Sequence, residues 1–193
     1  DQSLVVAYKG ISDRKTIFNP TQHVYFNLRG HHRGSVCDHL LWIDAKQSTR
    51  KNKEGIPDGT FFDVKNTPFD FTCPAPLSKT MTLEDEQLRW SDGLDQNYCL
   101  TPCDDGIVRE VASLEDPISG RKMTVLTDAC GMHIYAGNHL DGVAGKGGWV
   151  YKNYDGVCLE TQFFPDAVHH EHFKSPLMLP NQPTYHMTAF RLS

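Results

Sequence analysis

Long apolar runs are missing from this 193-residue sequence, and none approaches the roughly 20 residues of a membrane-spanning helix. A basic segment followed by an apolar one is also missing at the start, so no secretory leader is visible. Positive charge is in the minority, with 19 Lys and Arg against 24 Asp and Glu and a formal net charge of −5. We therefore expect neither nucleic acid nor a membrane as a partner.

Cysteine is too scarce for a disulfide scaffold. The six cysteines, at positions 37, 73, 99, 103, 130 and 158, show no tight pairing, and several lie in apolar stretches, as Cys158 does before Leu159. We expect buried free thiols of a cytoplasmic protein. The composition, 39% hydrophobic and 22% charged, is typical of a globular protein, and the length favours a single domain over residues 1–193.

Several motifs of nucleotide and hydrolase chemistry are absent as well. The sequence has no G-x-G-x-x-G, no G-x-x-x-x-G-K-[ST] and no G-x-S-x-G. The Gly-Lys-Gly-Gly run at 145–148 lacks the spacing of a phosphate loop and is interpreted as a turn. A nicotinamide fold, a phosphate loop and a serine hydrolase therefore find no support.

Ten histidines make a metal centre the competing interpretation. The densest clusters are the His-His-Glu-His run at 169–172 and the pair at 31–32, but adjacent side chains on a strand point to opposite faces and chelate poorly. The spacing matches no zinc signature, and Cys99 with Cys103 has no second pair of ligands. The sequence predicts no metal, and we expect activity to survive dialysis against EDTA.

Short apolar segments separated by Gly, Pro, Asn and Asp predict a nearly all-β protein. The expected strands are 3–9, 23–28, 40–45, 60–64, 97–101, 107–113, 122–127, 132–136, 156–162 and 184–191. One short helix is expected at 83–88, with Thr82 as its N-cap. The polar run 46–53 is interpreted as a solvated hairpin loop. Without alternation of strands and helices, a parallel sheet is disfavoured, and the sequence predicts an antiparallel fold.

Alternation gives three of these segments an apolar face and a face with chemistry. The polar faces carry His23, Tyr25 and Asn27; His133 and Tyr135; and Cys158, Glu160 and Gln162. Sheets that line a sugar cleft combine polar groups for hydroxyls with aromatic rings for the apolar side of the sugar.

Three residues stand out as candidates for proton transfer, each with a structural alternative. Glu160 lies in mid-strand among apolar neighbours, where a carboxylate is costly unless it is hydrogen-bonded or used. His23 is either a satisfied core histidine or an acid–base group. Asp95 lies where a turn becomes a strand, which also fits an Asx-turn. Together they provide an acid, a base and a hydrogen-bonding carboxylate.

Five segments in order resemble motifs of the aldose 1-epimerase family. Residues 19–28, Asn-Pro-Thr-Gln-His-Val-Tyr-Phe-Asn-Leu, are similar to N-x-T-x-H-x-Y-F-N-L, and 159–162 with 164–168 are similar to L-E-T-Q-x-x-P-D-A. The others are 56–60 with 67–71, then Gly-Leu-Asp-Gln-Asn-Tyr at 93–98, and Gly-Asn-His-Leu-Asp-Gly at 137–142. The matches span nearly the whole chain.

This resemblance implies an antiparallel β-sandwich with a sugar cleft, interconversion of the α and β anomers of free aldoses such as galactose and glucose, and no cofactor. By position, Glu160 corresponds to the general base and His23 to the general acid. Asp95 corresponds to a sugar ligand, and His133 and Tyr25 are expected to contact the sugar. His133 replaces the family's usual glutamine.

The resemblance covers the C-terminal portion of the family chain. We therefore expect an open sheet that packs against an upstream segment, a separate chain or a second copy. Val5, Phe26 and Leu28 are expected to be solvent-facing in this chain alone, and a protein of residues 1–193 alone is expected to aggregate or to have very low activity.

Two other functions remain open from the sequence. A non-catalytic sugar-binding relative would keep the cleft without the acid–base chemistry. A glycosidase would need Glu160 and Asp95 to face one glycosidic bond.

Overall fold

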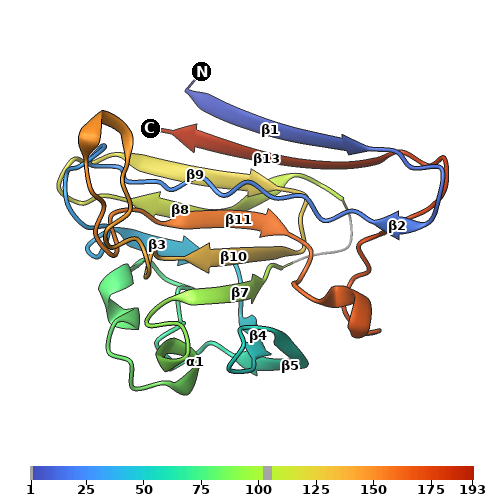
Figure 1. Cartoon of the computed structure of the whole chain (residues 1–193), viewed down its shortest axis with the longest axis horizontal. Helices are drawn as coiled ribbons and strands as arrows, with labels where there is room; N and C mark the ends of the chain where they lie inside the picture. The colour runs from blue at the N-terminus through green and yellow to red at the C-terminus, as the bar shows by residue number, and fades with distance from the viewer. Residues whose placement is uncertain (1, 102–105) are drawn as a thin grey trace.

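Two antiparallel β-sheets make up most of the protein, as the computed structural model shows for residues 2–101 and 106–193 (Figure 1). The six-stranded sheet runs in the order β1 (Ser3–Gly10), β13 (Thr184–Leu192), β9 (Lys122–Thr127), β8 (Arg109–Glu115), β3 (Leu40–Ile43) and β6 (Ala75–Pro76). The five-stranded sheet runs in the order β11 (Cys158–Gln162), β10 (Gly131–Tyr135), β7 (Asp95–Cys99), β4 (Gln47–Lys51) and β5 (Pro57–Asp63). The strands β2 (Thr16–Ile17) and β12 (Leu177–Met178) form a small third sheet.

Helical structure is sparse in the described part of the chain. It consists of one α-helical turn, α1 (Glu86–Arg89), and three 3-10 turns: η1 (Leu77–Thr80), η2 (Lys146–Gly148) and η3 (Ala167–His169). None of the described helices is long and apolar enough to cross a membrane.

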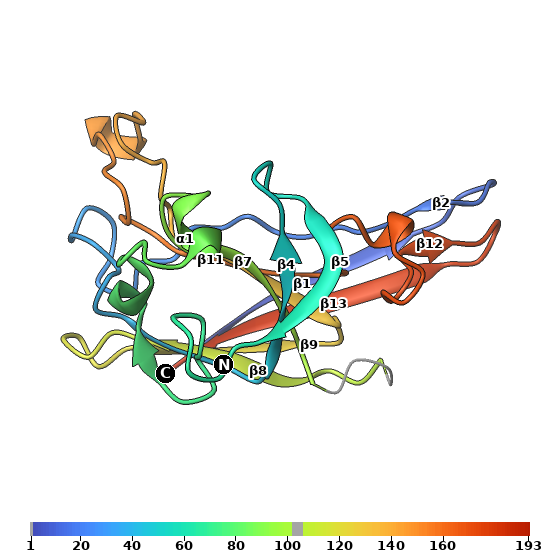
Figure 2. The same cartoon turned by 90° about the horizontal axis from the view of Figure 1, so that it is seen from below.

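One hydrophobic core joins the two large sheets. In Figure 2, β8 and β9 lie below β7 and β11, and the core between the sheets includes Met123 and Val125 of β9 with Met132, Ile134 and Leu159 of the five-stranded sheet. All five of these side chains are completely buried. The chain is therefore an antiparallel β-sandwich, and the alternation predicted for 132–136 and 156–162 places the correct apolar residues inside.

The segment 23–28 does not form the predicted strand. Its only backbone pairing is an isolated bridge between Phe26 and Val157. Two side-chain amides just before it, those of Asn19 and Gln22, hydrogen-bond to the backbone of Phe163 and Leu159 in place of a backbone ladder.

The predicted helix begins too early. Leu83 has a positive φ of 53°, which is incompatible with a right-handed helix, and α1 starts only at Glu86. Its N-cap is Asp85, whose carboxylate accepts a hydrogen bond from the backbone N–H of Gln87, and not the expected Thr82.

The polar run 46–53 contains an interior strand and not the predicted solvated loop. The strand β4 lies between β7 and β5, and Ser48, Thr49 and Lys51 are buried. Ser48 donates a hydrogen bond to the carbonyl of Asn97 at 2.7 Å. Polar side chains tolerate this burial because they find partners there.

The expected exposure of apolar residues is correct for only part of the set. Val5 is 55% exposed on β1, which is an edge strand paired only with β13. Phe26 is half-buried against Phe190, and Leu28 is buried in the core, so the expectation for Leu28 is wrong.

The cysteines differ from the prediction as well. Cys130 and Cys158 are buried, but Cys73 is exposed and Cys37 and Cys99 are half-buried. Cys103 lies outside the described residues.

Candidate functional site

The five predicted site residues line one hollow on the face of the five-stranded sheet turned away from the core. The hollow has a volume of about 540 Å³. Its lining comprises His23, Tyr25, Gly55, Asp95, His133, Tyr135, His139, Glu160, Gln162 and Pro165. Two larger hollows, of about 600 and 790 Å³, contain none of the predicted acid–base pair. The side chains suited to acid–base chemistry therefore indicate the hollow of about 540 Å³ as the candidate site.

Strand register sets the relative positions of the polar side chains. His133 on β10 lies directly opposite Glu160 on β11, and β10 also pairs with β7, which carries Asp95. Nε2 of His133 lies 2.5 Å from Oδ1 of Asp95. Three neighbouring strands thus carry a carboxylate, an imidazole and a second carboxylate across one face.

Glu160 is buried in mid-strand, as the sequence predicts, and only 7% of its surface is exposed. Burial raises the pKa of its carboxyl group, while the nearby His133 and His23 oppose that shift. Oε1 of Glu160 lies 3.4 Å from Nε2 of His23. A carboxylate with a raised pKa is a stronger proton acceptor than an exposed one, which suits a general base.

The segment that carries His23 is tied to β11 by side-chain amides. Asn19 donates to the carbonyl of Phe163 at 3.2 Å and accepts from the N–H of Phe163 at 2.8 Å. Gln22 donates to the carbonyl of Leu159 at 2.8 Å and accepts from the N–H of Val24 at 2.8 Å. These contacts take the place of a backbone ladder, so amide side chains separate residues 19–24 from β11.

The separation leaves room for the ring of His23 beside β11. Its Nε2 faces Glu160, and its Nδ1 lies 3.3 Å from Sγ of Cys158. The ring of Tyr25 lies 5.1 Å from it between centroids, and the ring of Tyr135 lies 6.0 Å away at a steep angle. His23 is therefore packed against two aromatic rings, with one edge facing a carboxylate.

Two neighbours of His23 are neutral at ordinary pH. Burial, followed by the charges of Cys158, Tyr135 and Glu160, raises the pKa of Tyr25 to about 12. Burial and then the nearby Glu160 carboxylate also raise the pKa of the Cys158 thiol. The hydroxyl of Tyr25 is thus available as a hydrogen-bond donor and acceptor.

Asp95 is held as a carboxylate beside His133 and Lys51. Burial alone would raise its pKa, but the hydrogen bond from His133, the charge of His133 and the charge of Lys51 outweigh it and lower the pKa. Lys51 is buried, and its Nζ donates to Ser91 Oγ and to the backbone carbonyl of Asp95. Asp95 is therefore not a mere Asx-turn residue.

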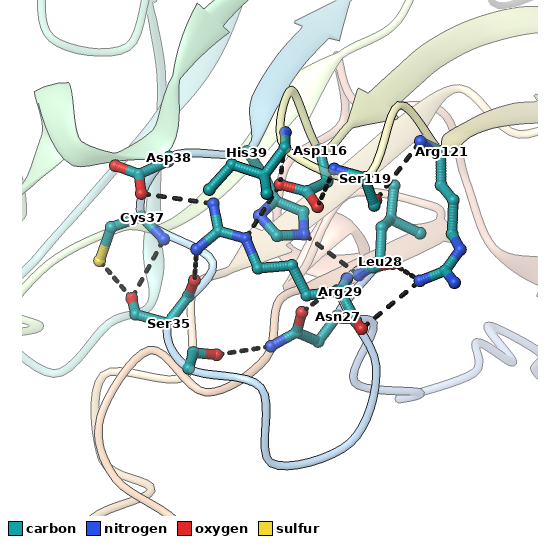
Figure 3. Close-up of polar contacts among 12 residues, drawn as sticks. Asn27, Leu28, Arg29, Ser35, Cys37, Asp38, His39, Asp116, Ser119 and Arg121 are labelled. Carbon is teal, nitrogen blue, oxygen red and sulfur yellow. Dashed lines mark hydrogen bonds and ion pairs between the residues drawn. The ribbon is translucent and has the colours of Figure 1, made fainter.

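The far end of the same segment is anchored by a second polar cluster (Figure 3). Arg29 donates to Oδ1 of the fully buried Asp116 at 3.0 Å. Burial alone would raise the pKa of Asp116, but hydrogen bonds from Ser119 and Arg29 lower it to about 2. Nε2 of His39, which is buried and whose pKa burial lowers to about 4, accepts from the N–H of Leu28 at 3.1 Å. Residues 19–29 are thus fixed at both ends.

The sequence predicted wrongly that one side chain points into the hollow, and it missed three residues in or beside the hollow. Asn27 does not enter the hollow; its amide donates to the carbonyls of Gly34 at 2.7 Å and Asp155 at 3.1 Å. Tyr135 and Gln162 carried the alternation signal and could have been named as site residues. Lys51 gave no signal, because a lysine within a polar run does not suggest burial.

Three metal-ligating side chains meet at the edge of the hollow, two of them in its lining, and local sequence spacing did not suggest this. Among the described residues, His23, Cys158 and Glu160 each place one ligand atom within 4.8 Å of the others. The histidine-rich run at 169–172 behaves differently. His170 and His172 contact the backbone carbonyls of Pro57 and Gly59, at 3.2 and 2.6 Å.

The known proteins that this chain resembles are aldose 1-epimerases and galactose mutarotases. The family model described as "Aldose 1-epimerase" matches residues 1–191. The chain is 36% identical to galactose mutarotase of Homo sapiens over 191 residues, 98% of this chain and 54% of that protein. It is 30% identical to aldose 1-epimerase of Haemophilus influenzae over 181 residues, 91% of this chain and 50% of that protein.

Solved structures share the fold. The GalM/aldose epimerase homologue from C. elegans has a TM-score of 0.86 at 23% identity, covering 100% of this chain and 56% of that one. Galactose 1-epimerase from Lactobacillus acidophilus NCFM has a TM-score of 0.83 at 26% identity, covering 100% and 53%. The chain spans about half the length of the relatives it matches.

Proposed function

Because the chain belongs to the aldose 1-epimerase family, we propose that this protein interconverts the α and β anomers of free aldoses such as galactose and glucose. Glu160 acts as the general base and His23 as the general acid. The observation that carries the proposal is the 3.4 Å approach of these two side chains in an open hollow of about 540 Å³.

The reaction needs one proton acceptor and one proton donor. Glu160, as a carboxylate, takes the proton from the C1 hydroxyl, and the electrons of that O–H bond form the C1 carbonyl. The C1–O5 bond breaks, and its electron pair on O5 takes a proton from the imidazolium of His23. Rotation about C1–C2 and attack of O5 on the other face of the aldehyde give the opposite anomer, while the two proton transfers reverse.

Three further residues hold the sugar in this proposal. Asp95 accepts hydrogen bonds from sugar hydroxyls, and its fixed negative charge strengthens them. His133, paired with Asp95, and the neutral hydroxyl of Tyr25 provide further contacts. Organic cofactors and metals take no part in the reaction as proposed.

The open side of the six-stranded sheet is covered by further protein in this proposal, either an upstream segment, another chain or a second copy. Two features support this. The edge strand β1 exposes Leu4 and Val5, and the hollow of about 600 Å³ beside it has Leu4, Phe26, Met123 and Phe190 in its lining. The cytoplasm is the proposed compartment, because Cys73 is an exposed thiol.

A polarimetric assay tests the function. Freshly dissolved α-galactose should approach its equilibrium rotation faster with the protein than without it. Sugar binding in calorimetry without any acceleration would instead favour a non-catalytic binding relative. Release of an aglycone from a galactoside would favour a glycosidase, and either result would overturn the proposal.

A further inference from the structure

His23, Cys158 and Glu160 offer three different ligand atoms close together: His23 and Glu160 line the hollow, and Cys158 is fully buried next to them. An imidazole nitrogen, a thiol sulfur and a carboxylate oxygen lie within 4.8 Å of one another. Cys158 and Glu160 are buried and come from β11, whereas His23 is exposed and comes from the segment tied beside it. Two of the ligands are thus fixed by the sheet, and the third can adjust.

The spacing is close to that of ligands around a tetrahedral ion. With Zn–N of about 2.0 Å and Zn–S of about 2.3 Å, neighbouring ligand atoms lie roughly 3.3–3.8 Å apart. Nδ1 of His23 is 3.3 Å from Sγ of Cys158, and Nε2 of His23 is 3.4 Å from Oε1 of Glu160. These contacts use different ring nitrogens, so an ion held by one nitrogen must draw the remaining ligand inward.

The ligand types select the class of metal. A set of one nitrogen, one sulfur and one oxygen suits Zn²⁺ and Co²⁺, whereas Mg²⁺ and Ca²⁺ prefer oxygen ligands alone. Three protein ligands leave a fourth position for water or another small ligand.

We propose that His23, Cys158 and Glu160 form a binding site for a thiophilic divalent cation such as Zn²⁺, and that the ion excludes the sugar and inhibits the protein. The thiol proton of Cys158 leaves to solvent when sulfur binds the ion, and His23 binds through an unprotonated nitrogen. Inhibition rests on the proposed function, because the ion occupies the lone pairs that the base and the acid use. Binding of the ion does not rest on it.

Cobalt absorption spectroscopy on the full-length protein tests the site without an activity assay. Titration with Co²⁺ should produce a thiolate-to-cobalt charge-transfer band in the near ultraviolet that saturates at one ion per chain. Added Zn²⁺ should remove the band. Cys158→Ala should lose it, whereas Cys130→Ala, which removes a buried thiol that is not one of the three ligands, should keep it. Circular dichroism shows whether each variant is folded.

His23→Gln provides a second variant, since His23 is exposed and its loss leaves the core intact. It should weaken cobalt binding at least tenfold. Absence of the band in the wild type, its persistence in Cys158→Ala, or unchanged affinity in His23→Gln would overturn the proposed site. Cobalt bound by the histidine-rich run at 169–172 gives no thiolate band.

A sugar competition separates the two proposals. Saturating galactose should reduce the cobalt band, and an unchanged band at saturating galactose would overturn the claim that ion and sugar exclude each other. A protein that gives the thiolate band but never accelerates mutarotation would retain the metal site and lose the proposed function.

Discussion

Glu160 and His23 lie in contact but differ in burial. Glu160 is nearly enclosed and its pKa is raised by burial, whereas His23 is exposed and reaches it across 3.4 Å. A buried carboxylate and an accessible imidazole fit the proposed reaction, in which one proton leaves the sugar at C1 while another arrives at O5.

Replacement of His23 tests the acid. His23→Asn should lower kcat far more than it raises KM, because proton donation acts mainly in the transition state. Steady-state polarimetry gives both constants, and His169→Asn, an exposed histidine outside the hollow, is the control. An effect on KM alone would make His23 a binding residue only.

Replacement of Asp95 tests sugar binding. Asp95→Asn removes the charge that strengthens its hydrogen bonds, so galactose binding should weaken by about 1–3 kcal/mol. Titration calorimetry measures the change, with Asp13→Asn on an exposed residue as the control. Unaltered affinity in the Asp95 variant would remove Asp95 from the sugar site.

Among the elements, the regular strands were predictable and the tied segment was not. Alternation correctly placed Met132 and Ile134 in the core and His133 on the face that lines the hollow, because a strand side chain points to one of only two faces. The segment 23–28 has the same alternation, but the side chains of Asn19 and Gln22 hydrogen-bond to Phe163 and Leu159 in place of a backbone ladder. A period of two cannot reveal such amide contacts.

The strand β4 was missed by the sequence prediction, which expected a loop there. Its sequence is polar enough to predict a solvated loop, yet Ser48 and Lys51 are buried with hydrogen-bond partners on β7 and near α1. Burial of polar residues depends on partners far away in the sequence, which composition does not disclose.

Gln22 provides a test of how the tied segment positions the acid. Gln22→Ala removes both its contact to Leu159 and its contact to Val24, so His23 should lose its alignment with Glu160. We expect kcat to fall by up to about 100-fold with a smaller change in KM. Gln47→Ala, on an exposed glutamine of β4, is the matched control.

Rescue distinguishes positioning from general destabilisation. Gln22→Glu retains the acceptor for the Val24 N–H and should recover part of the lost kcat, whereas Gln22→Met fills the space without hydrogen bonds and should not. Equal rates in wild type and Gln22→Ala would contradict the positioning role.

For the whole molecule, the buried His39 makes stability depend on pH. Its pKa falls from an ordinary 6.5 to about 4 on folding because burial disfavours the charged ring. Between pH 4 and 6.5, His39 is therefore protonated in the unfolded chain but not in the folded chain. The contribution of neutral His39 to the free energy of unfolding is complete above pH 6.5 and is lost as the pH falls towards 4. The total loss is on the order of 3 kcal/mol.

Urea denaturation at a series of pH values measures this loss. The wild type should lose unfolding free energy between pH 6.5 and 4, and His39→Gln, which cannot take up a proton, should show a shallower slope. Identical slopes in the two proteins would remove His39 as the cause.

In the proposed reaction, turnover depends most on Glu160 as the general base. The most direct measurement is the polarimetric rate of α-galactose mutarotation by Glu160→Gln, beside wild type and Glu110→Gln, which makes the same change on an exposed glutamate of β8. The account predicts a folded Glu160→Gln variant whose rate is at least about 100-fold lower, with Glu110→Gln unchanged. A Glu160→Gln variant that turns over galactose at the wild-type rate would contradict it.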